Sequence, residues 1–335
     1  MIIDVHGHYT TEPARLGAFR RAQLRGEDPS ADALLTAISD DEVRASVEGN
    51  QLRVLRERGG DHMLFSPRAS GMSHHEPDPA VANAWARASN DLVHRVSELF
   101  PQHFSPVAQL PQTPEGNLDG VLAELRRTVE DLGFVGANLN PDPSGTWAGV
   151  PLTDPVWFPI FEAASELDVP LMVHVSTACN PNFHTLGAHY LNADTSVFMQ
   201  LLQSDLFERF PDLRLVIPHG GGAVPFHWGR YRGLAMRNDW QDPSELLRNV
   251  FFDTAVYHQP GYDLLLEVIP ASNVLFASEM LGAVRGADPA TGIEWDDTLR
   301  YLRASRRDDA DFRAITHDNA MRVYPRLAPR GGGAA

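Results

Sequence analysis

Short runs of β-branched and aromatic residues alternate along this chain with longer segments whose apolar residues recur every three or four positions. Eight such runs predict strands, at residues 2–5, 62–66, 104–110, 134–139, 171–175, 213–217, 250–254 and 274–277. Between two of them, Leu118, Val121, Leu125 and Val129 mark one face of a helix that ends at Gly133. This eightfold alternation predicts an α/β protein, a (β/α)8 TIM barrel.

A doubly wound open sheet is the alternative architecture. It usually has a glycine-rich phosphate loop after its first strand, whereas this chain has His6-Gly7-His8 there. Two connections are long, at residues 9–50 and 68–103 after the first and second strands. They are either lids or substrate-binding walls, or surface decoration. We expect one domain at residues 1–330 and a disordered tail at 331–335.

The composition of the chain excludes several kinds of partner and of catalytic chemistry. The 335 residues include 44 acidic and 28 basic side chains, a formal net charge of -16, which argues against nucleic acid or an anionic membrane as the main partner. Every basic residue is arginine, so a Schiff-base lysine, a P-loop lysine and a carbamylated-lysine metal bridge are excluded. Cys179 is the single cysteine, which excludes an internal disulfide. The chain shows neither a signal-peptide core nor an apolar run of about 18 residues, so we expect a cytoplasmic protein.

Metal-ligating side chains stand at the ends of several predicted strands. His6 and His8 follow the first strand with the spacing that points two side chains to one face, and His174 lies in the fifth. Glu279 follows the eighth strand, where a buried acid needs a partner or a metal. Three imidazoles and a carboxylate suit one Zn²⁺ per subunit, or another divalent metal. The plainer reading of His174 is a core histidine bonded to backbone.

Other polar residues near strand ends are candidates for binding a substrate. They are Ser66, Arg68, His75, Asn138, Asn140 and Arg285. Each arginine offers a bidentate clamp for a carboxylate. The two asparagines share one face, but they could equally fix the turn at residues 141–145, and His75 lies on a long loop where histidines are more often solvated.

Four segments spread over nearly the whole chain resemble the amidohydrolase superfamily, in the branch of metal-dependent decarboxylases and hydratases. They are Ile3-Asp4-Val5-His6-Gly7-His8, Val173-His174-Val175, Ile217-Pro218-His219-Gly220-Gly221-Gly222 and the closing stretch at residues 319–325. The resemblance implies a barrel with a zinc site at its mouth. It implies catalytic roles for Glu279, His219 and Tyr190, with Glu279 acting as metal ligand or as acid–base group.

The decarboxylases of this branch usually have aspartate after the eighth strand, where this chain has Ser278-Glu279-Met280. That difference, and the segments at residues 66–70 and 189–195, are similar to hydratases of the meta-cleavage catabolism of protocatechuate and gallate. The resemblance implies a homo-oligomer that adds water to the double bond of 4-oxalomesaconate or a related anionic polycarboxylate. A decarboxylase of an aromatic or muconate-type acid, a lactone or amide hydrolase, and a non-catalytic metal-binding scaffold stay open as alternatives.

Overall fold

Eight parallel strands form one sheet in the order of the sequence. The computed structural model describes residues 1–327, so the predicted tail at 331–335 lies outside the described residues. The strands are β1 (Ile3–Tyr9), β2 (His62–Pro67), β3 (Phe104–Gln109), β4 (Gly136–Leu139), β5 (Leu171–Val173), β6 (Leu215–Ile217), β7 (Val250–Asp253) and β8 (Val274–Leu275). The backbone N–H of Val5 donates to the carbonyl of Phe276, which joins the β8 end of the sheet to β1. The predicted (β/α)8 barrel is confirmed.

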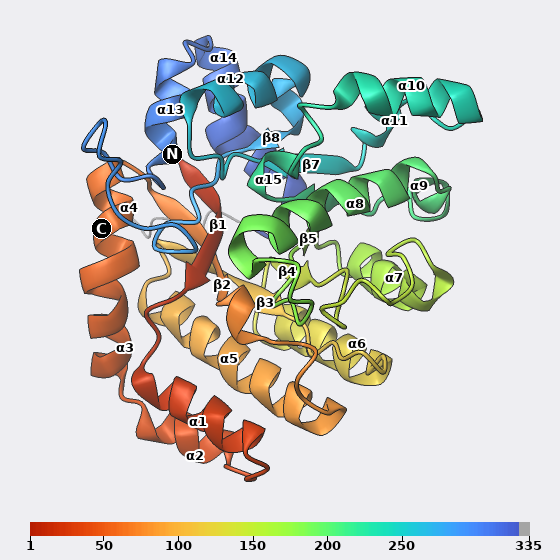
Figure 1. The fold of residues 1–335 in the computed structure, drawn as a ribbon. Helices are drawn as coiled ribbons and strands as arrows, with labels where there is room; N and C mark the ends of the chain where they lie inside the picture. Colours follow the sequence, from red (N-terminus) through yellow and green to blue (C-terminus); the bar gives the residue numbers. More distant parts are fainter. Residues whose placement is uncertain (328–335) are drawn as a thin grey trace.

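Helices surround the sheet on its outer side (Figure 1). They are α1 (Ala14–Leu24), α2 (Ala31–Ala37), α3 (Asp40–Val47), α4 (Arg53–Arg58), α5 (Pro79–Leu99), α6 (Leu118–Arg126), α7 (Phe158–Glu166), α8 (Tyr190–Leu202), α9 (Leu206–Arg209), α10 (Trp228–Asn238), α11 (Pro243–Leu246), α12 (Gln259–Val268), α13 (Thr298–Ala304), α14 (Asp309–Arg313) and α15 (Asn319–Val323). The connection between β1 and β2 contains α1 to α4 and extends past the predicted end at residue 50, the connection between β2 and β3 contains α5, and α1, α2 and α5 lie side by side in Figure 1. Most of these two connections is therefore helical outer layer.

Two apolar layers hold the barrel together. The inner layer lies inside the sheet and includes Val5, Leu64, Val216 and Phe251, with Tyr324 beyond α15 packed against it. The outer layer fills the space between the sheet and the helices. Because alternate side chains of a strand point to opposite faces, one strand supplies both layers.

The first strand is longer than predicted and irregular. Asp4 pairs with Met63 of β2 but Gly7 pairs with Phe65, so Val5 and His6 together oppose one residue of β2. Such a bulge re-aims side chains and is common beside active sites. Gly7 is required at this point, because a Cβ there would lie 2.3 Å from the sulfur of Met63. The simple alternation used to place His6 and His8 on one face is therefore modified by the bulge.

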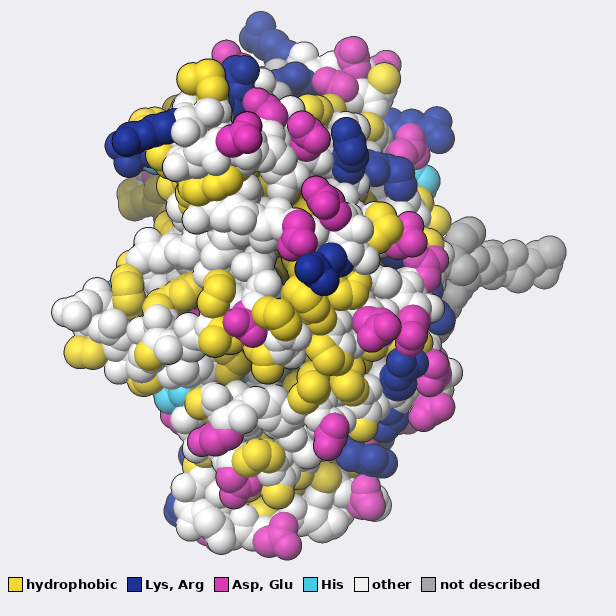
Figure 2. Space-filling model, turned by 90° about the vertical axis from the view of Figure 1, so that its right-hand side faces the viewer, with side chains coloured by type: hydrophobic (Ala, Val, Ile, Leu, Met, Phe, Trp, Pro, Cys, Tyr) yellow, Lys and Arg dark blue, Asp and Glu magenta, His cyan; other side chains and the backbone are white. Residues whose placement is uncertain are grey.

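No helix within residues 1–327 is both long and apolar enough to cross a membrane. The face of the molecule turned toward the reader in Figure 2 gathers apolar side chains over its middle, with acidic and basic side chains around them. Apolar atoms make up a large part of any protein surface, and this distribution by itself indicates no partner.

Candidate active site

Three imidazoles converge inside the barrel at the carboxyl ends of the strands. Nε2 of His8 lies 3.0 Å from Nε2 of His6 and 3.2 Å from Nε2 of His174. All three side chains are buried. The structure thus brings together the three histidines predicted as metal ligands.

The opposite nitrogen of each ring is held by a fixed partner. Nδ1 of His6 lies 2.7 Å from Oδ2 of Asp253, and Nδ1 of His174 lies 2.8 Å from the carbonyl of Val175. Each partner can only accept a hydrogen bond, so Nδ1 carries the proton and donates, and Nε2 keeps its lone pair. Metal-ligating histidines are typically oriented in this way.

His8 is fixed similarly. Its Nδ1 lies 2.8 Å from Oγ of Ser66, whose hydroxyl is placed to donate to the carbonyl of Gly7 at 3.2 Å. Burial and the neighbouring imidazoles hold the pKa of His8 and of His174 well below the ordinary histidine value. Both rings are therefore neutral at neutral pH, the form that binds a metal. The donor set fits a divalent transition metal.

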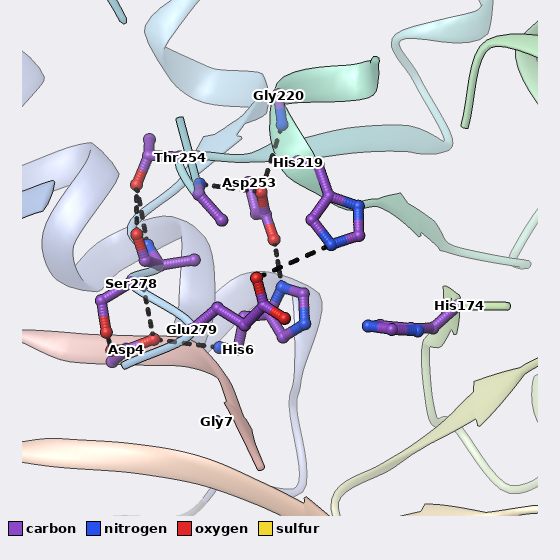
Figure 3. Close-up of polar contacts among 12 residues, drawn as sticks. Asp4, His6, Gly7, His174, His219, Gly220, Asp253, Thr254, Ser278 and Glu279 are labelled. Carbon is purple, nitrogen blue, oxygen red and sulfur yellow. Dashed lines mark hydrogen bonds and ion pairs between the residues drawn. The ribbon is translucent and has the colours of Figure 1, made fainter. Parts of the chain in front are cut away.

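Glu279 and His219 lie beside these rings, as Figure 3 shows. One ligand atom from each of His6, His174, His219 and Glu279 falls within 4.8 Å of the others. Nε2 of His219 is 3.9 Å from Oε2 of Glu279, and the hydroxyl of Tyr257 donates to that oxygen at 2.8 Å. The carboxylate of Glu279 is thus held between a phenol and an imidazole.

The backbone is strained where these two side chains begin. His219 has φ +52° and Glu279 has φ +50°, both in the left-handed region that non-glycine residues seldom adopt. The N–H of Glu279 donates to the carbonyl of His6, which ties this turn to β1. Strain of this kind clusters at functional sites, where the surrounding structure enforces it.

His219 forms a buried ion pair with Asp194, with 2.9 Å between Nδ1 and Oδ2. Burial alone would lower the pKa of His219, but the charge and hydrogen bond of Asp194 outweigh it and raise that pKa to about 9. Burial raises the pKa of Asp194 to about 6. At neutral pH the imidazole is protonated and the carboxylate ionised. His219 in this form is therefore suited to donating a proton.

Two cavities open onto this cluster. One, of about 160 Å³, is lined by His8, Thr10, Arg68, Ala69, Ser70, His174, Leu186, Tyr190, Glu279, Gly282, Ala283 and Arg285. Its wall therefore contains both the imidazoles and carboxylate of the site and the guanidinium groups of Arg68 and Arg285. The other, of about 410 Å³, shares Leu186, Tyr190, Glu279 and Ala283 and has many apolar residues in its wall, among them Pro225 and Phe226.

Of the six predicted substrate-binding residues, only the two arginines line the smaller cavity. Arg68 and Arg285 line the smaller cavity, and the starts of both long connections form part of its wall. Ser66 orients His8, and the side-chain amide of Asn138 donates to Ser66 Oγ at 3.2 Å. Ser66 therefore supports His8 directly and Asn138 supports it through Ser66, and neither lines the smaller cavity.

Asn140 and His75 belong to the loops above the strands. The amide of Asn140 lies 3.0 Å from Nδ1 of His74, and its side-chain oxygen accepts from the N–H of Asp142. This matches the turn-fixing alternative for Asn140. His75 is half-buried, with Nδ1 3.5 Å from the hydroxyl of Thr177, and neither residue lines the two cavities.

Three residues that contact the candidate site residues were not singled out from the sequence pattern. Asp253 ends β7 directly after an apolar run, the same signal that singled out Glu279, so it could have been found. Asp194 lies within α8 and Tyr257 in the loop after β7. Their partners lie 25 and 22 residues further along the chain, and no local pattern marks either pair.

Comparison with known proteins identifies the family. The amidohydrolase family model matches residues 3–326. The chain belongs to the amidohydrolase family. It is 53% identical over 332 residues, 98% of this chain and 97% of the other, to the 2-keto-4-carboxy-3-hexenedioate hydratase of Sphingobium sp. (strain NBRC 103272 / SYK-6).

Two solved structures share the fold of this chain. The crystal structure of 4-oxalomesaconate hydratase from Rhodopseudomonas palustris is 51% identical, with a TM-score of 0.90 over 98% of this chain and 96% of that one. The 5-carboxyvanillate decarboxylase from Sphingomonas paucimobilis is 22% identical with a TM-score of 0.71, over 97% and 98% of the two chains, and shows the fold alone.

Proposed function

We propose that this amidohydrolase is a hydratase that adds water to the carbon–carbon double bond of 4-oxalomesaconate or a closely related unsaturated polycarboxylate. The observation that carries the proposal is a cavity lined by Glu279, by the neutral imidazoles of His8 and His174, and by the guanidinium groups of Arg68 and Arg285. The chain is more than 50% identical over nearly its full length to two hydratases, which supports the same chemistry. The setting would be catabolism of aromatic acids such as protocatechuate and gallate.

We propose His6, His8 and His174 as ligands of one divalent metal, with Zn²⁺ the first choice for three imidazoles. Such a metal supplies Lewis acidity and a water of lowered pKa. Glu279 lies within reach as a fourth ligand or as the acid–base group. The hydrogen bond from Tyr257 occupies Oε2 of Glu279 and leaves Oε1 for this task.

The remaining residues act on the substrate's charges and protons. Arg68 and Arg285 line the cavity and would bind carboxylates, stabilising the negative charge that develops on them as water adds. His219 is protonated because of Asp194. It would deliver this proton to the carbon of the double bond that does not take up the hydroxyl group. Tyr190 is the other candidate donor, but burial and the charge of Glu279 raise its pKa above the ordinary phenol value, which favours His219.

The test is an ultraviolet assay of metal-loaded protein with 4-oxalomesaconate, together with measurement of CO2. Loss of the conjugated chromophore without CO2 release supports a hydratase. Glu279→Gln should abolish turnover, since the amide cannot accept a proton. If Glu279→Gln retains wild-type turnover, Glu279 is not the acid–base group.

A decarboxylase is the second candidate. The larger cavity beside Glu279 has room and apolar walls for an aromatic ring. A γ-resorcylate decarboxylase from Rhizobium sp. (strain MTP-10005) is 29% identical over 303 residues, 83% of this chain and 87% of that one. Stoichiometric CO2 release from an aromatic acid in the same assay would favour this candidate.

A further inference from the structure

Arg68 stands between two spaces of different kinds. On one side it lines the cavity that contains His8, His174 and Glu279. On the other side it lines a much smaller cavity of about 20 Å³, together with Glu12 and residues of α5. Its side chain is 47% exposed. An exposed arginine loses side-chain conformational entropy when it binds a ligand, because several rotatable bonds become fixed. Something must hold the guanidinium in place if it is to bind a carboxylate well.

Glu12 is the group placed to do so. Its Oε1 lies 3.1 Å from Nη2 of Arg68, and the Glu12 side chain is only 13% exposed. Burial raises the pKa of Glu12, while the charges of Arg68 and Arg285 act against that rise. The two arginines that face the substrate cavity are thus the cations that favour ionised Glu12.

Glu12 shares the small cavity with two other unpartnered polar groups. Oε2 of Glu12, Nε1 of Trp85 and Oγ of Ser89 are buried and have no hydrogen-bond partner among the described residues. All three residues line the small cavity, and Trp85 and Ser89 are 7% and 2% exposed. A buried polar group without a partner is costly, and a cavity of this size holds one water molecule.

The three groups match the hydrogen-bonding capacity of water. The indole N–H of Trp85 can only donate and Oε2 of an ionised Glu12 can only accept, while the hydroxyl of Ser89 can do either. One water would accept from Trp85, donate to Glu12 and complete a third bond with Ser89. Three hydrogen bonds are typical of buried waters.

We propose that Glu12 is a positioning residue that holds the Arg68 guanidinium at the rim of the substrate cavity, and that one water bound by Glu12, Trp85 and Ser89 holds Glu12. This inference rests on the proposed role of Arg68 in binding a polycarboxylate. Glu12 does not touch the substrate; it sets the affinity of the cavity through Arg68.

The test measures binding rather than turnover, so it does not depend on hydration. The probe is tricarballylate, a saturated tricarboxylate, titrated calorimetrically into metal-loaded protein. Glu12→Ala should weaken its binding roughly fivefold, the effect expected for a partly exposed ion pair. Ser89→Ala should weaken binding in the same direction. Ser97→Ala, which removes another buried hydroxyl of α5 bonded only to the carbonyl of His94, should leave binding unchanged.

A double-mutant cycle separates positioning from general damage to the fold. In the Arg68→Met background, Glu12→Ala should have no further effect on the dissociation constant, because Glu12 acts on the substrate through Arg68. Equal weakening in both backgrounds would overturn the proposal. So would tighter binding by Glu12→Ala alone, since that would make Glu12 a competitor of the substrate.

Two further results separate this proposal from the proposed function. A high-resolution crystal structure should show one water within hydrogen-bonding distance of Glu12, Trp85 and Ser89, and an empty cavity would overturn the proposed bracing of Glu12. Absence of hydration with tricarballylate binding intact would overturn the hydratase alone. Absence of tricarballylate binding to the wild type would overturn both the polycarboxylate cavity and the role of Glu12.

Discussion

Asp253→Asn is the substitution that most directly probes how the imidazole cluster is prepared for a metal. Oδ2 of Asp253 accepts the Nδ1 proton of His6 at 2.7 Å, while Oδ1 accepts from the N–H groups of Gly220 and Ala255 at 3.3 and 3.0 Å. Burial opposes the ionisation of Asp253, but its hydrogen bond with His6 outweighs burial and lowers its pKa. The carboxylate is therefore ionised throughout the neutral range.

An asparagine has only one side-chain oxygen, so it cannot accept hydrogen bonds both from His6 and from the backbone N–H groups of Gly220 and Ala255. If its amide faces His6, Nδ1 must accept a hydrogen bond and the ring proton moves to Nε2, which then cannot bind a metal. If its oxygen faces His6, the amide group confronts two backbone donors. Either arrangement loses a hydrogen bond to a charged group, about 1.5–3 kcal/mol, equivalent to roughly 10–100-fold in metal affinity.

The assay is a zinc competition titration against a chromophoric chelator, with the apo proteins compared by thermal unfolding. Asp142→Asn is the matched control, because Asp142 is also a buried aspartate but accepts from Ser144 and Trp147 in a loop away from the imidazoles. We expect weaker metal binding only in Asp253→Asn. Unchanged metal affinity in that variant would refute the assignment of His6 as a ligand oriented by Asp253.

Three further predictions concern residues around the cavity. Tyr257→Phe removes the hydrogen bond to Glu279 and should lower kcat roughly tenfold with metal content unchanged, measured by steady-state kinetics; an unaltered kcat would contradict this role. Arg68→Met should raise KM for a polycarboxylate more than it lowers kcat, and unchanged kinetics would remove Arg68 from the binding set. Burial lowers the pKa of His74 from 6.5 to about 4, so its contribution to stability is complete above pH 6.5 and is lost as the pH falls toward 4. Urea unfolding should show this loss, about 3 kcal/mol near pH 4, in the wild type but not in His74→Gln, and equal pH dependence in both would contradict it.

The barrel and its histidine cluster were predictable because both follow from local pattern. Eight apolar runs fixed the order of strands, and the carboxyl ends of barrel strands meet at one mouth, so His6, His8 and His174 had to be neighbours. The bounds were less accurate. The predicted first strand at residues 2–5 extends to Tyr9, and the predicted eighth strand at 274–277 ends at Leu275.

The residues that orient the site were not predictable in the same way. Asp194 reaches His219 from a helix, and Tyr257 reaches Glu279 from a loop. Both contacts depend on the packing of helices and loops around the sheet, which the spacing of apolar residues does not encode. The bulge in β1 is a further example, because it follows from the pairing of β1 with β2 rather than from either strand alone.

The most direct test of the central claim is to run the reaction of metal-loaded protein with 4-oxalomesaconate in isotopically labelled water and analyse the product by mass spectrometry. We predict a product that has gained one labelled water, no CO2, and loss of the reaction when the metal is removed by a chelator. A product that has lost CO2, or one that forms equally well without metal, would contradict the account.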